Sequence, residues 1–313
     1  MEFRKAERRN AKLRLGITGP AGSGKTYGAL LVAFGLGGKI AMIDTENGSG
    51  DLYSALGDYD VCSLQAPFTV QKYLEAIKMA ENAGYDVIII DSLSHAWAGE
   101  GGLLDMQGKI ADCGRKNSFA AWREVTPYHN KLVETILASK CHIIATMRSK
   151  MEYIQVENEH GKKEIRKVGL APVQRDGMEY EFGTVFDLSV NHFVNVSKDR
   201  TSMFDGQMFK LSEDTGRVLK EWLESGIDYD AIRKRKKAIY DSYMEKYNDA
   251  EQVKDAMLRA TGGKSSKDWT AEDMDKLEAD LLQKTPPAKS QAKQLDTQDV
   301  QIEADFDAKD NVA

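Results

Sequence analysis

The sequence predicts an α/β fold in which helices cover both faces of a mainly parallel sheet, with a small helical segment after it. Four nearly continuous apolar runs carry this prediction, because strands buried on both faces have that pattern. The runs are LRLGIT (13–18), KIAMID (39–44), DVIIID (86–91) and HIIATM (142–147). Longer stretches with apolar residues at helical spacing separate them, and strands that alternate with helices form parallel sheets.

The later elements differ in their spacing. Three short apolar segments (184–190, 192–197 and 207–212) lie too close together for crossover helices, so we expect antiparallel strands at one edge of the sheet. After about residue 221 the spacing is helical only, and Thr270 with Asp273 predicts a capping box. The predicted organisation is a basic arm (1–12), an α/β core (13–222), a helical appendage (223–284) and a disordered acidic tail (285–313).

Composition restricts the class of protein. The chain has 313 residues, 43 Lys and Arg against 49 Asp and Glu, a formal net charge of −6, and 42% hydrophobic residues. These values are ordinary for a globular protein, and no apolar run reaches the ~18 residues of a membrane span. Three cysteines far apart in the chain exclude a disulfide scaffold and a four-cysteine zinc site. We expect a cytoplasmic protein without a membrane partner.

A phosphate-binding motif is the most specific signal. The motif G-x-x-x-x-G-K-[ST] is formed by Gly19, Pro20, Ala21, Gly22, Ser23, Gly24, Lys25 and Thr26. It lies between a predicted strand and a predicted helix, the context that distinguishes it from a glycine-rich turn. Its backbone N–H groups would surround phosphate oxygens at the positive end of the helix. Lys25 would reach the β- and γ-phosphates of ATP, and the Thr26 hydroxyl would bind Mg²⁺.

Acidic residues at two strand ends complete the predicted site. Asp91 ends the third apolar run, with Ser92 beside it, and would hold the Mg²⁺ directly or through water. Glu46 follows the second run, at the sheet edge where ligands bind, so it is the candidate general base for the attacking water. The alternative is that Asp44 or Glu46 only caps a loop.

Five stretches, in this order, resemble the RecA-like ATPase core: GPAGSGKT (19–26), IDTE (43–46), DVIIIDS (86–92), KVGLAPVQRDGMEYEF (167–182) and VSKDRTSMF (196–204). More narrowly, residues 13–211 resemble phage RecA-like ATP-binding proteins of the single-strand annealing and recombination type. The resemblance implies an ATPase with Glu46 at the water-activating position. It also implies that Lys198 and Arg200 are catalytic residues of a K-x-R position, which points at the nucleotide of a neighbouring subunit in a homo-oligomeric ring or filament. A solvated turn is the alternative for this triplet.

The resemblance further implies that two loops, residues 99–118 and 148–176, hold single-stranded DNA. The second loop is basic, which suits phosphate contact. Between residues 162 and 175 it carries five cations, Lys162, Lys163, Arg166, Lys167 and Arg175. An ordinary solvated hairpin is the alternative. The strand end HIIATMRSK (142–150) lacks the glutamine that bacterial recombinases have there, and Arg148 is the candidate replacement.

Together these features predict an ATPase that assembles on single-stranded DNA and assists phage recombination, annealing or replication. Two alternatives stay open. One is an ATP-dependent loader or remodeller of a protein partner, such as a single-strand binding or annealing protein, with little direct DNA contact. The other is an ATP-binding scaffold without hydrolysis.

Overall fold

Residues 3–113, 118–157 and 163–282 are described by a computed structural model of the chain. The chain divides into two compact units, one of residues 11–226 and the other of residues 1–10 with 227–313. The larger unit contains the sheet, and the smaller unit contains helices. Within these described ranges, no helix is long and apolar enough to cross a membrane.

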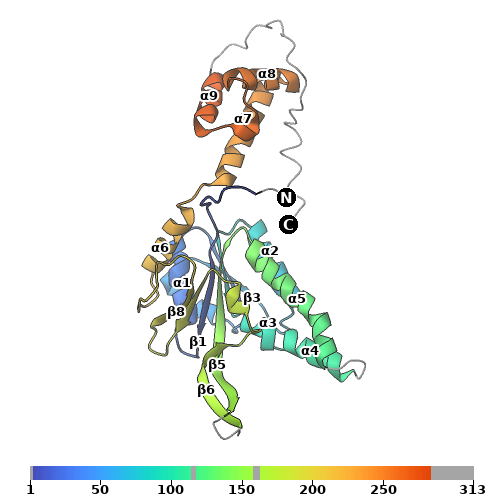
Figure 1. Ribbon diagram of the computed structural model, residues 1–313, viewed down its shortest axis with the longest axis vertical. Helices are drawn as coiled ribbons and strands as arrows, with labels where there is room; N and C mark the ends of the chain where they lie inside the picture. The colour runs from blue at the N-terminus through green and yellow to red at the C-terminus, as the bar shows by residue number, and fades with distance from the viewer. Residues whose placement is uncertain (1–2, 114–117, 158–162, 283–313) are drawn as a thin grey trace. The chain divides into compact units, whose positions relative to one another are not determined.

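The larger unit is built on a sheet with the strand order β3-β2-β4-β5-β1-β7-β8, and β6 pairs with β5 outside this path. Neighbouring strands are parallel except for β7 with β8 and β5 with β6. The strands are β1 (Arg14–Gly19), β2 (Ile40–Asp44), β3 (Asp60–Ser63), β4 (Val87–Asp91), β5 (His142–Glu157), β6 (Lys163–Pro172), β7 (Thr184–Leu188) and β8 (Val194–Asp199). This is the predicted α/β fold, a mainly parallel sheet with antiparallel edge strands (Figure 1).

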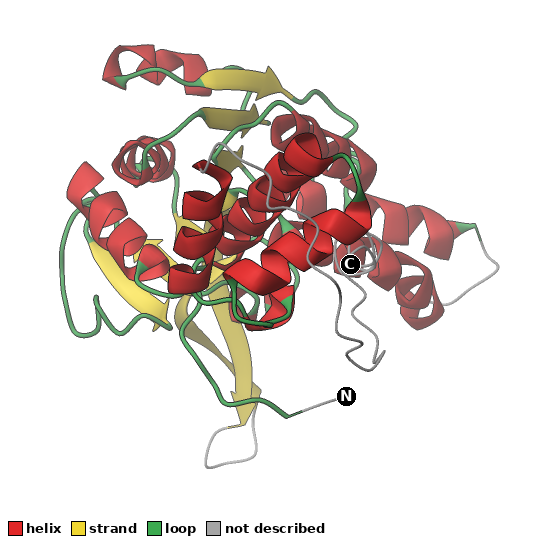
Figure 2. Cartoon of the chain, turned by 90° about the horizontal axis from the view of Figure 1, so that it is seen from above, coloured by secondary structure: helices red, strands yellow, loops and turns green. Residues whose placement is uncertain are grey.

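Helices cover the sheet on both faces because its central strands are apolar on both. β2 and β4 are buried along their whole length. The covering helices are α1 (Lys25–Leu36) and α6 (Glu213–Glu224) on one face, and α2 (Val70–Asn82), α3 (Ser94–Ala98) and α5 (Ser118–Ala138) on the other. Met42 and Ile89 belong to the first layer of the core, and Ile43 and Ile88 to the second. In Figure 2 the yellow strands lie among the red helices.

The helices α1 and α6 approach closely because each presents a glycine at the contact. A Cβ on Gly35 would lie 2.0 Å from the Glu213 carbonyl oxygen, and a Cβ on Gly216 would lie 2.2 Å from the Val32 carbonyl oxygen. No side chain fits at either position in a close-packed interior. This contact holds α1 against the sheet, and the amino end of α1 follows the predicted phosphate loop.

The smaller unit has its own apolar core. Its helices are α7 (Tyr229–Tyr247), α8 (Ala250–Ala260) and α9 (Ala271–Leu282), and Tyr243, Met257 and Leu277 are buried between them. The predicted capping box at the start of α9 is confirmed. Thr270 N–H donates to Asp273 Oδ2 at 2.8 Å, and Asp273 N–H donates to Thr270 Oγ1 at 3.3 Å.

Two expectations about irregular segments are wrong. At 207–212 the structure has a single bridge, between Phe209 and Val194, in place of the expected strand. Apolar residues of this region pack as a loop instead, since the rings of Phe204 and Phe209 lie 5.4 and 5.7 Å from that of Phe186. The stretch 99–118 is not a simple loop either, because α4 (Leu103–Asp112) forms inside it. The predicted acidic tail lies outside the described residues.

The strand β5 is longer than predicted. Up to Arg148 it pairs with β1, and from Ser149 onward it pairs with β6 in an antiparallel hairpin. The hairpin extends past the edge at which the parallel strands β1, β2 and β4 end (Figure 1). The second predicted DNA loop is therefore largely a two-stranded hairpin that begins beside the carboxyl ends of these strands.

Candidate nucleotide-binding site

The predicted phosphate loop connects β1 to α1 and has an open backbone. Gly22 and Gly24 have φ angles of 75° and 87°, in the left-handed region that glycine adopts without strain. Lys25 Nζ donates to the carbonyl oxygens of Gly19 and Pro20, both at 2.9 Å, so its ammonium lies over the loop. Backbone N–H groups at the amino end of a helix, with an adjacent cation, favour the binding of phosphate.

Thr26 and Asp91 meet although 65 positions separate them in the sequence. Thr26 Oγ1 donates to Asp91 Oδ2 at 2.6 Å, and Thr146 Oγ1 donates to the other carboxylate oxygen. Asp91 is 2% exposed, and burial raises the pKa of its carboxyl despite these hydrogen bonds. A buried carboxylate beside a hydroxyl suits Mg²⁺, which prefers oxygen ligands and retains waters and phosphate oxygens. The two predicted Mg²⁺ residues thus fit the ion.

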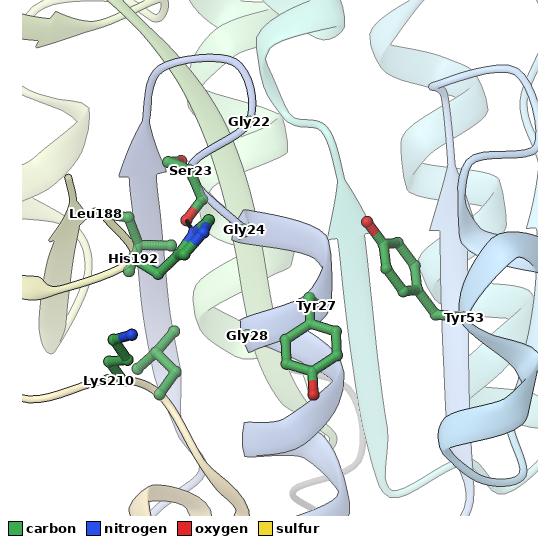
Figure 3. Close-up of a pocket in the computed structure, with 10 residues that line it drawn as sticks. Gly22, Ser23, Gly24, Tyr27, Gly28, Tyr53, Leu188, His192 and Lys210 are labelled. Atoms are coloured by element: carbon green, nitrogen blue, oxygen red, sulfur yellow. Dashed lines mark hydrogen bonds between the residues drawn. The ribbon is translucent and has the colours of Figure 1, made fainter. Parts of the chain in front are cut away.

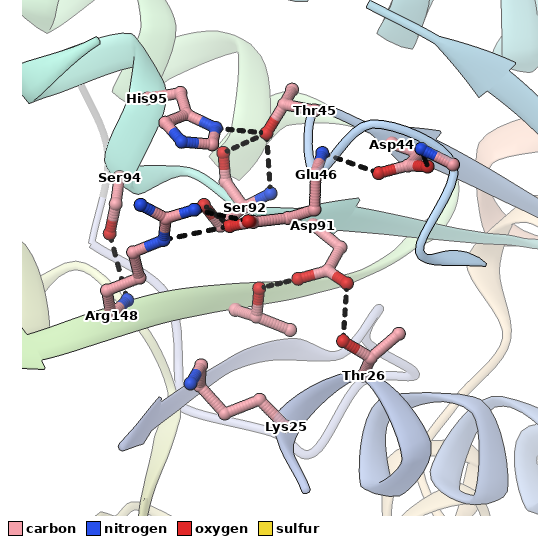
Figure 4. Close-up of polar contacts among 12 residues, drawn as sticks. Lys25, Thr26, Asp44, Thr45, Glu46, Asp91, Ser92, Ser94, His95 and Arg148 are labelled. Carbon is pink, nitrogen blue, oxygen red and sulfur yellow. Dashed lines mark hydrogen bonds and ion pairs between the residues drawn. The ribbon is translucent and has the colours of Figure 1, made fainter. Parts of the chain in front are cut away.

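The two acids after β2 have different environments. Asp44 is 1% exposed, and its carboxylate accepts the N–H groups of Glu46 at 2.6 Å and Gly48 at 2.8 Å. Asp44 therefore caps the loop, as the alternative interpretation proposes for one of these acids. The Glu46 carboxylate instead faces β4 and β5, where Ser92 Oγ donates to its Oε1 at 3.0 Å (Figure 4).

Arg148 holds both carboxylate oxygens of Glu46. Its Nε donates to Oε1 at 3.0 Å and its Nη2 to Oε2, which makes a bidentate ion pair. Partial burial raises the pKa of Glu46, but the hydrogen bonds from Arg148 and Ser92 outweigh it and leave the pKa below its ordinary value. The sequence singles out Arg148 only as a replacement for a glutamine. The ion pair joins residues 102 positions apart, so no local signal could predict it.

A buried hydrogen-bond network joins the ends of β2 and β4 behind these acids. Thr45 Oγ1 accepts the Ser92 N–H at 2.8 Å and lies 2.7 Å from His95 Nδ1. Thr45 and Ser92 are 1% and 0% exposed. The network holds the backbone on either side of Glu46 and Asp91. Thr45 lies within the IDTE stretch and His95 lies in none of the matching stretches, but the sequence singles out neither as a site residue.

A pocket of about 450 Å³ lies beside the phosphate loop (Figure 3). Tyr27 of α1, Tyr53 of the 3-10 helix η1 (Gly50–Leu56), His192 of the β7–β8 turn and Lys210 line it. The two tyrosine rings meet edge to face with their centroids 5.9 Å apart. Aromatic rings with a few polar groups beside a phosphate site suit a nucleotide base. No local pattern in the sequence marks this pocket, because four separate segments form it.

The structure does not bring Lys198 and Arg200 to the phosphate loop of their own chain. Lys198 pairs with Val185 near the amino end of β7, whereas the phosphate loop follows the carboxyl end of β1, which runs parallel to β7. Lys198 Nζ donates to the carbonyl oxygens of Glu179 at 3.2 Å and Tyr180 at 2.5 Å. Burial and the neighbouring Arg200 lower the pKa of Lys198. Arg200 is exposed at this opposite edge of the sheet.

The predicted DNA-binding cations lie on or beside the β5–β6 hairpin. Lys163, Arg166 and Lys167 belong to β6. Lys162 lies outside the described residues. Arg175 follows β6, and its guanidinium carbon lies 5.9 Å from the centroid of the Trp122 ring. The positions of this set that the structure describes therefore lie in β6 or shortly after it.

Comparisons with known proteins identify a family and a solved structure to which the chain is similar. Residues 11–220 match the AAA domain family. No curated protein shows significant sequence similarity to the chain. In the comparison with solved structures, 67 chains match, and one of them is the crystal structure of the RadB recombinase. That match covers 66% of this chain and 90% of the RadB chain, with 18% sequence identity and a TM-score of 0.37. Because the family match spans two thirds of its length, the chain belongs to the AAA domain family.

Proposed function

We propose that this protein binds and hydrolyses ATP, with Mg²⁺, as a RecA-like ATPase of the cytoplasm. One observation carries the proposal: four predicted site residues from three separate segments converge at one edge of the sheet. They are Lys25 and Thr26 at the start of α1, Glu46 after β2 and Asp91 at the end of β4. Nucleotide hydrolysis needs this set of a phosphate cation, two metal ligands and a base.

The chain's own groups divide the work of hydrolysis. The N–H groups of the phosphate loop and the Lys25 ammonium would hold the phosphates, and Thr26 and Asp91 would hold Mg²⁺. The ion, when bound, neutralises charge that develops between the β- and γ-phosphates. Glu46 accepts a proton from the attacking water. Its lowered pKa keeps the carboxylate ionised at neutral pH, but Arg148 occupies both of its oxygens, so the base must be released before it acts.

We further propose that hydrolysis depends on single-stranded DNA held at the β5–β6 hairpin, in phage recombination, annealing or replication. Contacts at both ends of the hairpin support this. Arg148, where β5 leaves the sheet, pairs with Glu46, and its N–H donates to Ser94 Oγ at 2.9 Å. At the other end, Gln174 Nε2 donates to the Leu93 carbonyl oxygen at 3.2 Å. A ligand that moves the hairpin would therefore act on Glu46.

A homo-oligomer with nucleotide at its subunit interfaces completes the proposal. Lys198 and Arg200 lie at the edge of the sheet opposite the phosphate loop of their own chain. They can contribute to hydrolysis only at the nucleotide of a neighbouring subunit, in a ring or a filament. An arginine supplied from outside the site stabilises charge in the transition state and makes hydrolysis depend on assembly.

Steady-state ATP turnover tests the function. The rate is measured for the protein alone, with an oligothymidine strand, with duplex DNA, and with a single-strand binding or annealing protein. Lys25→Ala protein gives the background. We expect turnover that single-stranded DNA raises, with a stimulation that weakens as salt increases. Stimulation by the protein partner alone would instead favour a loader, and absence of turnover in every mixture would contradict an ATPase.

A further inference from the structure

Hydrogen bonds define the backbone of the turn between β7 and β8, which lies beside the phosphate loop. His192 N–H donates to the Ser189 carbonyl oxygen and Ser189 N–H to the Phe193 carbonyl oxygen, both at 2.9 Å. Ser189 Oγ also accepts the Phe193 N–H at 3.1 Å. His192 has a φ of 67°, a left-handed conformation that few side chains adopt readily. The turn thus fixes the backbone of His192 and the direction in which its side chain leaves the backbone.

The His192 ring hydrogen-bonds to the backbone of the phosphate loop. His192 Nδ1 lies 3.0 Å from the Ser23 carbonyl oxygen (Figure 3). Because a carbonyl oxygen only accepts, Nδ1 carries the hydrogen. The ring also closes the space beside Gly24, where an added Cβ would lie 3.2 Å from Nδ1. His192 therefore touches the loop at the peptide between these two residues.

That peptide couples the contact to phosphate binding. The Ser23 carbonyl and the Gly24 N–H belong to one planar trans peptide, so they point in opposite directions. A hydrogen bond that holds the carbonyl toward His192 therefore turns the Gly24 N–H away from His192. Within the described chain this N–H has no acceptor, which leaves it available to an anion. Backbone N–H groups arranged in advance bind phosphate without the cost of ordering the loop.

We propose that His192 is a positioning residue of the nucleotide site, which orients the Ser23–Gly24 peptide for phosphate binding. The inference rests on the proposed nucleotide function and assigns a role to a residue outside the phosphate motif. Two roles for His192 are thereby distinguished, because the residue lies both against the phosphate loop and in the pocket. A positioning residue acts on the phosphates, whereas a residue that contacts the base acts on the nucleoside.

The test compares four variants by calorimetry and competition binding. His192→Gly adopts the left-handed φ freely and has no donor, and His192→Leu keeps bulk without a donor. His192→Asn tolerates the same φ, and its amide N–H can replace Nδ1–H. Asn191→Ala, an exposed neighbour in the same turn, is the matched control. The ligands are ATP, ADP, inorganic triphosphate and adenosine, and thermal unfolding of each protein shows that it is folded.

We expect the glycine and leucine variants to bind ATP, ADP and triphosphate about 3- to 10-fold more weakly, the effect of one lost hydrogen bond. The asparagine variant and the control should bind within about 2-fold of wild type, and adenosine should bind all proteins equally. If the glycine variant binds triphosphate as wild type does, the inference is wrong while the proposed function stands. Equal losses for adenosine and ATP would also overturn it. Wild-type protein that binds no nucleotide would overturn the proposed function itself.

Discussion

Removal of the Arg148 guanidinium should accelerate ATP hydrolysis in the absence of DNA. Arg148→Met keeps most of the side-chain stem but removes the donors that hold both oxygens of Glu46. Two consequences act in the same direction. The carboxylate no longer has to be released before it accepts a proton, and its pKa rises because the lowering hydrogen bonds are lost. Both make Glu46 more effective as a base at neutral pH.

The size of the effect follows from the exposure of the pair. The Arg148 side chain is 49% exposed and that of Glu46 is 23% exposed. Exposed ion pairs contribute about 0–1 kcal/mol, whereas hydrogen bonds to charged groups contribute about 1.5–3 kcal/mol. A bidentate pair that is half in solvent should lie between, at about 1–2 kcal/mol. Each 1.36 kcal/mol is a factor of about ten, so basal turnover should rise roughly 5- to 30-fold.

The assay is steady-state phosphate release at saturating ATP, with and without an oligothymidine strand. Arg123→Met, at an exposed arginine of α5, is the matched control and should match wild type. Arg148→Lys keeps the charge without the bidentate geometry and should lie between wild type and Arg148→Met. We also expect DNA to stimulate Arg148→Met less than wild type. A fall in basal turnover would refute this reasoning, because it would mean that Arg148 stabilises the transition state.

Three further predictions concern DNA, assembly and stability. Joint replacement of the hairpin cations Lys162, Lys163, Arg166 and Lys167 by Gln should reduce the salt dependence of single-strand binding by about one counterion per lost phosphate contact, and an unchanged slope would place DNA elsewhere. Arg200→Ala and Lys25→Ala proteins should each be inactive alone, and a mixture of the two should recover ATP turnover. Labelled wild-type protein shows first whether subunits exchange, and exchange without recovered turnover would exclude Arg200 from the site of the neighbouring subunit. Burial, with nearby cations, lowers the pKa of His142 to about 3 in the folded protein. Between about pH 6.5 and pH 3, His142 therefore binds a proton in the unfolded protein but not in the folded protein. The free energy of unfolding should therefore fall as pH falls through that range, and His142 contributes at most about 1.4 kcal/mol per pH unit. Denaturant unfolding at several pH values should show that the free energy of unfolding depends less steeply on pH in His142→Asn than in wild type.

The sequence predicted those elements that a short, uninterrupted pattern of residues marks. The central strands are recognisable because they are buried on both faces and hence apolar throughout. The phosphate loop is recognisable because its glycines and Lys25 are adjacent. The strand β3 was missed because it lies at the edge and is mostly exposed, so its sequence DVCS has no apolar run. The β5–β6 hairpin lies outside the main strand order, and the sequence indicated a hairpin there only as the alternative to a DNA-binding loop.

The contacts that define the site could be predicted only in part. The convergence of Glu46 and Asp91 follows from a general rule, because parallel strands end at one edge of the sheet. The residues that contact this site do not follow from that rule. Arg148 reaches Glu46 because β5 lies next to β4, and His192 reaches Ser23 because β7 lies next to β1. Strand order decides both contacts, and apolar runs carry no information on strand order.

The central claim is that Glu46 activates the water at a site where Lys25 captures ATP, and one paired measurement tests it. ATP affinity by calorimetry and turnover are determined for wild type and for Glu46→Gln, with Lys25→Ala as the variant that should lose binding itself. The amide keeps the size of the carboxylate but cannot accept a proton. We predict that Glu46→Gln binds ATP as wild type does while its turnover falls by roughly 10²–10⁴. Turnover near the wild-type rate in Glu46→Gln would contradict the account.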